Sequence, residues 1–410
     1  MDSPTDPTDS GRRRKGYSKD EILLLRRIDK SSLSYPGALA DELNQPPAIP
    51  TPTHWQLGVR RWACRASLLL FLGSISLLAA SKSLAQGNAL CSAICYLPAW
   101  WLVMPAWLAL MMTAPWQWRL NAALGAVLLG SLLWADHWQW PTAAPQTLKD
   151  DASLRLLSWN RGQGKGASLR AMIAETQPDV IALQDAKVSY YLNNPQYQDY
   201  PWISGSGEFV ILSRHPVDQV EEVKAESRSN ERQSLLWGLR CRVDFRGRTV
   251  ELVNLHAPSP RRHLTSLLRG RALLGLLSLL PVEAIQQRSQ QTDAYWQPYL
   301  DFFHRLASRA ITSSQPQLLI GDFNTPPCGP IHRALTEVLT DCHLEAGSGF
   351  GHTFPGNYDQ PLTLFQPWLR LDAAYASKHW QTLRCIPLEH DAQHLPLYVE
   401  LKLKPQASAP

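Results

Sequence analysis

Hydrophobic and polar residues follow three different patterns along this chain of 410 residues. Residues 1–60 are polar and rich in proline and serine, which is typical of a flexible tail. Residues 61–140 contain long runs without charge, and such runs predict membrane-spanning helices. Residues 152–405 alternate short apolar runs with ordinary globular charge, which predicts a soluble domain joined to the helices by a linker at 141–151.

Three runs between residues 61 and 140 predict a membrane anchor of three transmembrane helices. A helix needs about 20 mostly apolar residues to cross a bilayer. Residues 90–112 reach this length, and residues 66–81 and 120–135 reach it with their flanks. The alternative of buried core helices is disfavoured, because three such segments in a row would need a large soluble partner domain.

The charges beside the first run predict the orientation of the anchor. Arg60, Arg61 and Arg65 abut it, and a basic run lies upstream at 12–15. Because basic flanks stay in the cytoplasm, we expect a multi-pass protein of the inner (cell) membrane with a cytoplasmic N-terminus. Three crossings would then place the soluble domain in the periplasm or its equivalent.

The soluble part reads as an α/β domain in which strands and helices are mixed. Such a pattern favours two mixed sheets packed together, with helices outside. The expected strands are 154–159, 179–184, 209–213, 235–244, 249–255, 317–321, 371–376 and 397–403, and the expected helices are 167–176, 284–309 and 330–339.

Two strings within this domain suggest chemistry. LLSWN at 156–160 and LLIGDFN at 318–324 are apolar runs that end in polar residues, as buried strands do when they carry functional groups to the edge of a sheet. Asp322 and Asn324 alternate around Phe323. At a period of two they would point the same way, so a carboxylate and an amide could meet at one reacting group.

Overall composition excludes little. The net charge of +5 is too mild to indicate nucleic-acid binding by itself. The seven cysteines include no CxxC pair and no Cys/His spacing typical of zinc, and a disulfide within the soluble part stays open.

Eight strings occur in order along the soluble domain, namely LLSWN (156–160), PDVIALQD (178–185), GEFVILSRHPV (207–217), ELVNLHAP (251–258), LLIGDFNTPP (318–327), GHTFP (351–355), LRLDAAYAS (369–377) and HLPLYVEL (394–401). In this order they resemble the endonuclease/exonuclease/phosphatase superfamily, the fold of deoxyribonuclease I. The resemblance covers essentially the whole soluble domain and implies a four-layer α/β sandwich of two mixed β-sheets flanked by helices. It also implies an enzyme that cleaves phosphate esters with Mg²⁺ or Mn²⁺.

The resemblance assigns a role to each matching residue. Asn160 and Asp185 fall on metal ligands, and oxygen ligands of this kind suit a hard cation. The other assignments concern catalysis: Asp322 and Asn324 would align the attacking water, His256 and His394 would face the phosphate together with Asn324, Asp372 would orient His394, and Glu208 would support His256.

Three positions depart from the family pattern. Asp185 stands where the family usually has Glu, so the carboxylate reaches one methylene less. Gln393 stands where the family usually has Asp directly before the last histidine, which removes a charge near the metal. Ala373 replaces a bulkier polar residue. We expect weaker metal binding than is usual in the family.

A basic, leucine-rich segment at 261–281 adds a hint about the substrate. It contains four arginines, nine leucines and no acidic residue, and it follows His256 closely. Segments of this kind can lie among lipid headgroups, although an ordinary helix that covers the sheet has a similar pattern.

We therefore expect a membrane-anchored, metal-dependent phosphohydrolase that cleaves phosphate ester or diphosphate bonds, with a lipid-linked substrate as one expectation. Membrane lipids and a phosphate-containing substrate are the expected partners, and no protein partner is predicted. Two alternatives stay open. One is an extracytoplasmic nuclease, which would need loops that track DNA and would bind in a salt-dependent way. The other is a non-catalytic binding protein with a degraded metal site.

Overall fold

The computed structural model describes residues 53–140, 153–162, 168–225, 235–268, 282–356 and 367–405. The residues from Arg60 onward form one compact unit, which contains the α/β domain and the apolar helices except residues 54–59 of the first. The expected tail lies almost wholly outside the described residues, and so does the expected linker.

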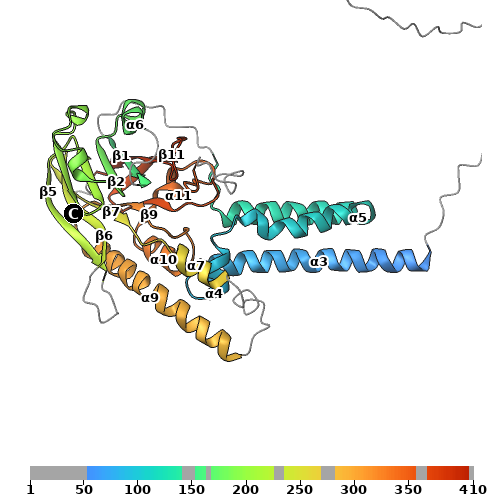
Figure 1. Cartoon of the computed structure of the whole chain (residues 1–410). Coiled ribbons are helices and arrows are strands. Elements are labelled where there is room, and N and C mark those ends of the chain that lie inside the picture. The colour runs from blue at the N-terminus through green and yellow to red at the C-terminus, as the bar shows by residue number, and fades with distance from the viewer. Residues whose placement is uncertain are drawn as a thin grey trace, which may run out of the picture. The chain divides into compact units, whose positions relative to one another are not determined.

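Helices α3 (His54–Ser83) and α5 (Ala99–Ala135) are long and apolar enough, by length and composition, to cross a membrane. Helix α5 is broken at Gln117, whose φ of −151° and ψ of 45° are not helical. Its two arms fold back on each other (Figure 1). The Asn121 side chain on the second arm donates a 2.7 Å hydrogen bond to the Leu110 carbonyl on the first.

The boundary expected for the second apolar run is wrong at its start. Residues 90–98 do not belong to a long helix: they form the short helix α4 (Ala89–Ile94) and a turn that ends at Pro98. Pro98 is the N-cap of α5, a position where its missing N–H costs nothing. Each arm of α5 is therefore roughly 18 residues or ~27 Å long, close to the thickness of a bilayer core.

The α/β domain contains two six-stranded sheets, in the orders β11-β12-β1-β2-β4-β3 and β5-β6-β7-β8-β10-β9. The first sheet has one parallel pair, β1 with β2, and the second has one, β7 with β8. All other pairs are antiparallel. The strands are β1 (Ser153–Asn160), β2 (Val180–Gln184), β3 (Trp202–Ser206), β4 (Phe209–Ser213), β5 (Val217–Ala225), β6 (Leu235–Phe245), β7 (Arg248–His256), β8 (Gln317–Asp322), β9 (Thr340–Asp341), β10 (Asp372–Ala376), β11 (Trp380–Pro387) and β12 (Leu397–Leu403).

The main core lies between the two sheets. Leu156 and Ile211 come from the first sheet and Leu252 and Ile320 from the second, and all four belong to one buried cluster. The remaining helices of the domain are α6 (Leu169–Thr176), α7 (Arg261–Leu268), α9 (Val282–Thr312), α10 (Gly329–Thr336) and α11 (Cys342–Ala346), with short 3₁₀ helices at Val188–Tyr190 and Pro195–Tyr197.

Helices cover the outer faces of both sheets (Figure 1). Phe303 of α9 packs with Leu319 of β8, and Met172 of α6 packs with Leu183 of β2. The expected α/β sandwich of two mixed sheets flanked by helices is confirmed.

The sheet register brings polar strand ends to one edge of the domain. Asn160 is paired with Gln184 at the ends of the parallel strands β1 and β2, and His256 is paired with Asp322 at the ends of β7 and β8. Asp372 begins the antiparallel strand β10 and lies opposite Asp322. Residues far apart in the chain therefore meet at this edge.

Candidate active site

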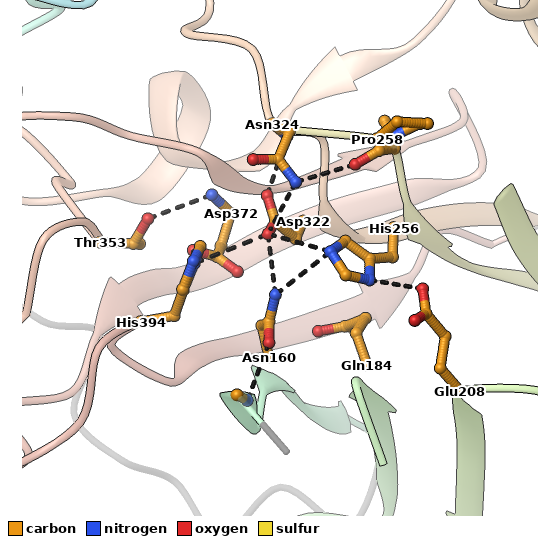
Figure 2. Close-up of polar contacts among 12 residues, drawn as sticks. Asn160, Gln184, Glu208, His256, Pro258, Asp322, Asn324, Thr353, Asp372 and His394 are labelled. Carbon is orange, nitrogen blue, oxygen red and sulfur yellow. Dashed lines mark hydrogen bonds and ion pairs between the residues drawn. The ribbon is translucent and has the colours of Figure 1, made fainter. Parts of the chain in front are cut away.

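Asp322 is the centre of the polar cluster at this edge. Its side chain is fully buried. Its Oδ2 atom accepts hydrogen bonds from the side-chain amides of Asn160, at 2.9 Å, and Asn324, at 3.2 Å. The same oxygen lies 3.7 Å from Nε2 of His256 and 3.7 Å from Nδ1 of His394, so two imidazoles flank one carboxylate (Figure 2).

Asn324 reaches the cluster through a turn. Strand β8 ends at Asp322, and Asn324 has a φ of 50°, in the left-handed region that asparagine tolerates better than most residues. Its backbone N–H donates to Oδ1 of Asp322 at 2.8 Å, and its side chain donates to the Ala257 carbonyl at 2.8 Å. The expectation that strand alternation aligns Asp322 with Asn324 is therefore wrong in its cause, although the two side chains do meet.

His394 forms a buried pair with Asp372, because Nδ1 of the imidazole lies 2.9 Å from Oδ2 of the carboxylate. Burial disfavours the charged imidazole, but Asp372 and Asp322 outweigh this effect and raise the pKa of His394 to about 9. The backbone N–H of Asp372 donates to Oγ1 of Thr353 at 3.1 Å, which fixes the start of β10. The geometry therefore holds His394 as an imidazolium near neutral pH.

His256 has a separate carboxylate partner, since its Nδ1 lies 2.7 Å from Oε1 of Glu208. Burial opposes the charge here too, but the hydrogen bond to Glu208 and the nearby Asp322 prevail and raise the pKa of His256. Two imidazoles thus face Asp322, each oriented by its own acid.

The expected metal ligands also lie at this edge. Oδ1 of Asn160 accepts a hydrogen bond from the Gly162 N–H at 3.0 Å. Asp185 lines a cavity of about 670 Å³ together with Glu208. A carboxylate and an amide oxygen suit a hard divalent cation, which keeps several waters, so this donor set fits Mg²⁺ or Mn²⁺. The other residues that line the cavity are Arg161, Ala186, Lys187, Tyr190, Tyr191 and Gly207.

The departures from the family pattern have different surroundings. Asp185 has a φ of 50°, and aspartate is enriched in this backbone conformation, which gives a physical reason for the shorter acid. Gln393 is exposed, and its Oε1 lies 3.7 Å from the place where a Cβ would stand on Gly162. It is therefore close to the loop that follows Asn160, but it brings no charge there.

Within the described residues, Asp322, Asp372 and His394 also lie close enough to hold an ion, with their ligand atoms within 4.8 Å of one another. The 2.9 Å contact between Nδ1 of His394 and Oδ2 of Asp372 favours a hydrogen-bonded pair instead, because this nitrogen donates to the carboxylate. Asp372 Oδ1 has no hydrogen-bond partner among the described residues. We therefore interpret these three residues as an acid–imidazolium cluster.

The sequence interpretation missed a buried polar bridge beneath the site. Nε2 of Gln184 on β2 donates to Oδ1 of Asn254 on β7 at 2.6 Å, and Nδ2 of Asn254 donates to the Leu183 carbonyl at 2.9 Å. This bridge joins the two sheets below His256. The sequence does contain an indication of this bridge. Asn254 interrupts an apolar run two residues before His256, and it therefore lies on the same face of the strand as His256.

Comparison with known proteins supports the resemblance. The family model described as Endonuclease/Exonuclease/phosphatase family matches residues 157–393, more than half of the chain. No curated protein matches the chain.

Several solved structures are similar to the chain at low identity. A structure of an endonuclease/exonuclease/phosphatase from Beutenbergia cavernae has 17% identity over 62% of this chain and 72% of that chain, with a TM-score of 0.42. A family protein from Bacteroides thetaiotaomicron has 16% identity over 62% and 98%, with a TM-score of 0.43. A D. rerio TDP2 structure, complexed with a single strand DNA product, has 14% identity over 62% and 100%, with a TM-score of 0.42.

The extent of the family match confirms what the eight strings and the two-sheet architecture indicated. The chain belongs to the endonuclease/exonuclease/phosphatase family, whose members are divalent-metal-dependent hydrolases of phosphoric esters.

Proposed function

We propose that the chain is a membrane-anchored phosphohydrolase whose reaction centres on Asp322. The observation that carries this proposal is the position of Asp322 Oδ2, which is buried and flanked by His256 and His394. A carboxylate between two oriented imidazoles can take a proton from water while the cations stabilise charge on phosphoryl oxygens.

Each side chain of the cluster has its own role in the proposed hydrolysis. Asp322 accepts a proton as the oxygen of water attacks phosphorus, and the Asn324 amide holds Asp322 in line. The bond from phosphorus to the leaving oxygen breaks. His256 and His394, charged through Glu208 and Asp372, neutralise the phosphoryl oxygens. A Mg²⁺ or Mn²⁺ ion held by Asn160 and Asp185 would supply Lewis acidity to the phosphate.

Membrane anchoring is supported by three apolar helical rods, namely α3 and the two arms of α5. Both ends of the α5 hairpin contact the α/β domain. Near its start, the Tyr96 hydroxyl donates to the Asn324 carbonyl at 2.9 Å, and beyond its end the ring of His137 meets the ring of His332 at 5.6 Å. The break at Gln117 therefore lies at the end of the hairpin away from the domain.

The charges at the two ends of the rods support an extracytoplasmic domain. At the far end, the Arg60 guanidinium lies 5.6 Å from the ring centre of Trp116, and Arg119 is close to Trp118 in the same way. At the domain end, Lys82 is neutralised by an ion pair of 2.8 Å with Asp136. Because uncompensated basic residues stay in the cytoplasm, the α/β domain is expected on the opposite side.

A lipid-linked substrate is supported by the position of α7. This helix follows His256 after a short loop, contacts α4 between the apolar helices, and carries Arg261 and Arg262 exposed on its surface. The rest of the basic, leucine-rich segment, residues 269–281, lies outside the described residues. Arginines beside the catalytic edge and next to an anchor suit a phosphate presented at a membrane surface.

The experiment is hydrolysis by the full chain in lipid nanodiscs, with Mg²⁺ or Mn²⁺. A generic phosphodiester, a lipid diphosphate and duplex DNA are assayed side by side. Asp322→Ala should abolish turnover, while Asp199→Ala, which removes an exposed carboxylate elsewhere, should leave it unchanged. Preference for the lipid supports the proposal, preference for DNA assigns a nuclease, and no turnover on any substrate by folded protein contradicts a hydrolase of these classes.

Orientation has its own test. A C-terminal alkaline phosphatase fusion to the full chain should be active if the α/β domain lies outside the cytoplasm. An inactive fusion, with a cytoplasmic reporter active in the same place, would refute the orientation.

A further inference from the structure

The segment between α3 and α5, residues 84–98, lies against the catalytic loop. We call this segment the junction, and we call residues 323–329, which directly follow Asp322, the catalytic loop. The junction contains α4, and its last residues lead into α5. In sequence the two segments are more than 200 residues apart, so nothing but the fold brings them together.

The central contact is a hydrogen bond from the Tyr96 hydroxyl to the backbone carbonyl of Asn324, at 2.9 Å. This carbonyl belongs to the residue held at a φ of 50°. A left-handed residue other than glycine keeps its conformation only where its surroundings determine it. The Asn324 side chain already donates hydrogen bonds to Asp322 and to the Ala257 carbonyl. The bond from Tyr96 in addition fixes the peptide group between residues 324 and 325.

Tyr96 is itself held in place by the α/β domain. The indole N–H of Trp368 donates to the Tyr96 carbonyl at 3.4 Å. Its neighbour Cys95 is buried together with Ala85 and with Cys328 of the catalytic loop. Beside the hydrogen bond, the junction is therefore packed against the catalytic loop at Cys95 and held to another part of the α/β domain by Trp368.

The end of the catalytic loop fits the junction closely as well. Gly329 has a φ of 73°, and a Cβ there would collide with the side chain of Gln86. The guanidinium of Arg333, in the helix that follows, donates to the Ser83 carbonyl at 3.2 Å. The contact thus extends from Asn324 to the first turns of α10.

We propose that Tyr96 is a positioning residue for Asn324, so that the anchor completes the catalytic centre and does more than tether it. The inference rests on the proposed function, because it assigns Asn324 to the reacting site. It requires the hydrolysis rate to depend on a hydroxyl group that lies outside the α/β domain and touches no substrate.

The test compares Tyr96→Phe with Tyr200→Phe in the full chain in nanodiscs. Tyr200 makes the same kind of bond, from its hydroxyl to the Pro178 carbonyl at 2.9 Å, away from the site. Loss of one such bond is expected to lower kcat about fivefold in Tyr96→Phe with KM unchanged, and to leave kcat of Tyr200→Phe at the parent value. Equal kcat values for the two variants would overturn the inference.

Hydrogen exchange of the loop peptide gives a readout that needs no turnover. In Tyr96→Phe, amides of the catalytic loop should exchange faster than in the parent chain or in Tyr200→Phe. Unchanged exchange would overturn the inference even if Asp322→Ala abolishes hydrolysis. Faster exchange in a chain that hydrolyses nothing would instead uphold the positioning contact and refute the proposed function.

Discussion

Replacement of Asp372 by Asn should move the basic limb of the pH–rate profile to lower pH. Asp372 touches Nδ1 of His394 at 2.9 Å and is the largest influence that favours the charged imidazole. The rise in the pKa of His394 from 6.5 to about 9 corresponds to about 3 kcal/mol in favour of the imidazolium. An amide at position 372 keeps the shape of the side chain and removes the charge.

The sign of the effect follows from burial. Without Asp372, burial still disfavours the imidazolium, and only the weaker influences of Asp322, at 3.7 Å, and Asp185 oppose it, so the pKa of His394 must fall. If the imidazolium stabilises the phosphoryl oxygens, the parent chain keeps its rate up to about pH 9, while the variant loses it at lower pH. Near pH 8.5 we expect a loss of about 100-fold, the lower end of the cost of losing one group that stabilises charge in the transition state.

The assay is kcat against pH, from about 5.5 to 9.5, for the full chain at saturating metal and substrate. The difference between variant and parent should shrink towards the acidic end, where His394 is charged in both. Asp199→Asn serves as the matched control. A uniform loss at every pH, with the basic limb unmoved, would refute the role of Asp372 in charging His394.

Three further results are expected. In a metal titration, Asp185→Ala should raise the Mn²⁺ concentration that gives the half-maximal rate by about 10-fold or more, and Gln393→Asp should lower it. If neither variant changes this concentration, neither residue belongs to the metal site. Arg370→Met should lower the free energy of unfolding by about 3–5 kcal/mol in denaturant melts, because it strands the buried Asp341 that Arg370 pairs with at 2.7 Å; a change below about 1 kcal/mol would contradict this. Burial, aided by Arg370, lowers the pKa of His343 to about 4, so between pH 6.5 and 4 the unfolded chain binds a proton that the folded chain excludes. The contribution of His343 to the free energy of unfolding should therefore fall by up to about 3 kcal/mol over that range, and His343→Gln should make the slope shallower by this amount.

The sequence predicted the central strands well because their patterns are simple. Strand β4 has the predicted bounds, and β8 extends the prediction by one residue, since both are continuous apolar runs that are buried on both faces. Strand β5 escaped prediction. Most of its side chains are exposed and four of the nine are charged, as suits the edge of a sheet, and such a run resembles a loop.

The sequence predicted those residues of the candidate site that lie at the ends of strands. Asn160, His256 and Asp322 close β1, β7 and β8. Parallel pairing of β7 with β8 brings His256 beside Asp322, and the packing of the two sheets brings Asn160 to them. The sequence correctly predicted that Asn324 lies beside Asp322, but the predicted cause was wrong. A turn, and not strand alternation, directs its side chain inward. Local pattern gives the polarity of a strand end, while the turn beyond it depends on hydrogen bonds that the pattern does not contain.

The contact between Tyr96 and Asn324 illustrates what no local pattern reveals. Residues 90–98 are apolar enough to continue a membrane helix, and on hydropathy alone they belong to one. The α/β domain competes for this segment: it offers a carbonyl to the Tyr96 hydroxyl and a buried place beside Cys328 for Cys95. A tyrosine hydroxyl and a loop carbonyl that bond each other avoid the cost of burying either one unpaired. These contacts hold the segment against the catalytic loop, and they are how residues outside the α/β domain can influence the proposed active site.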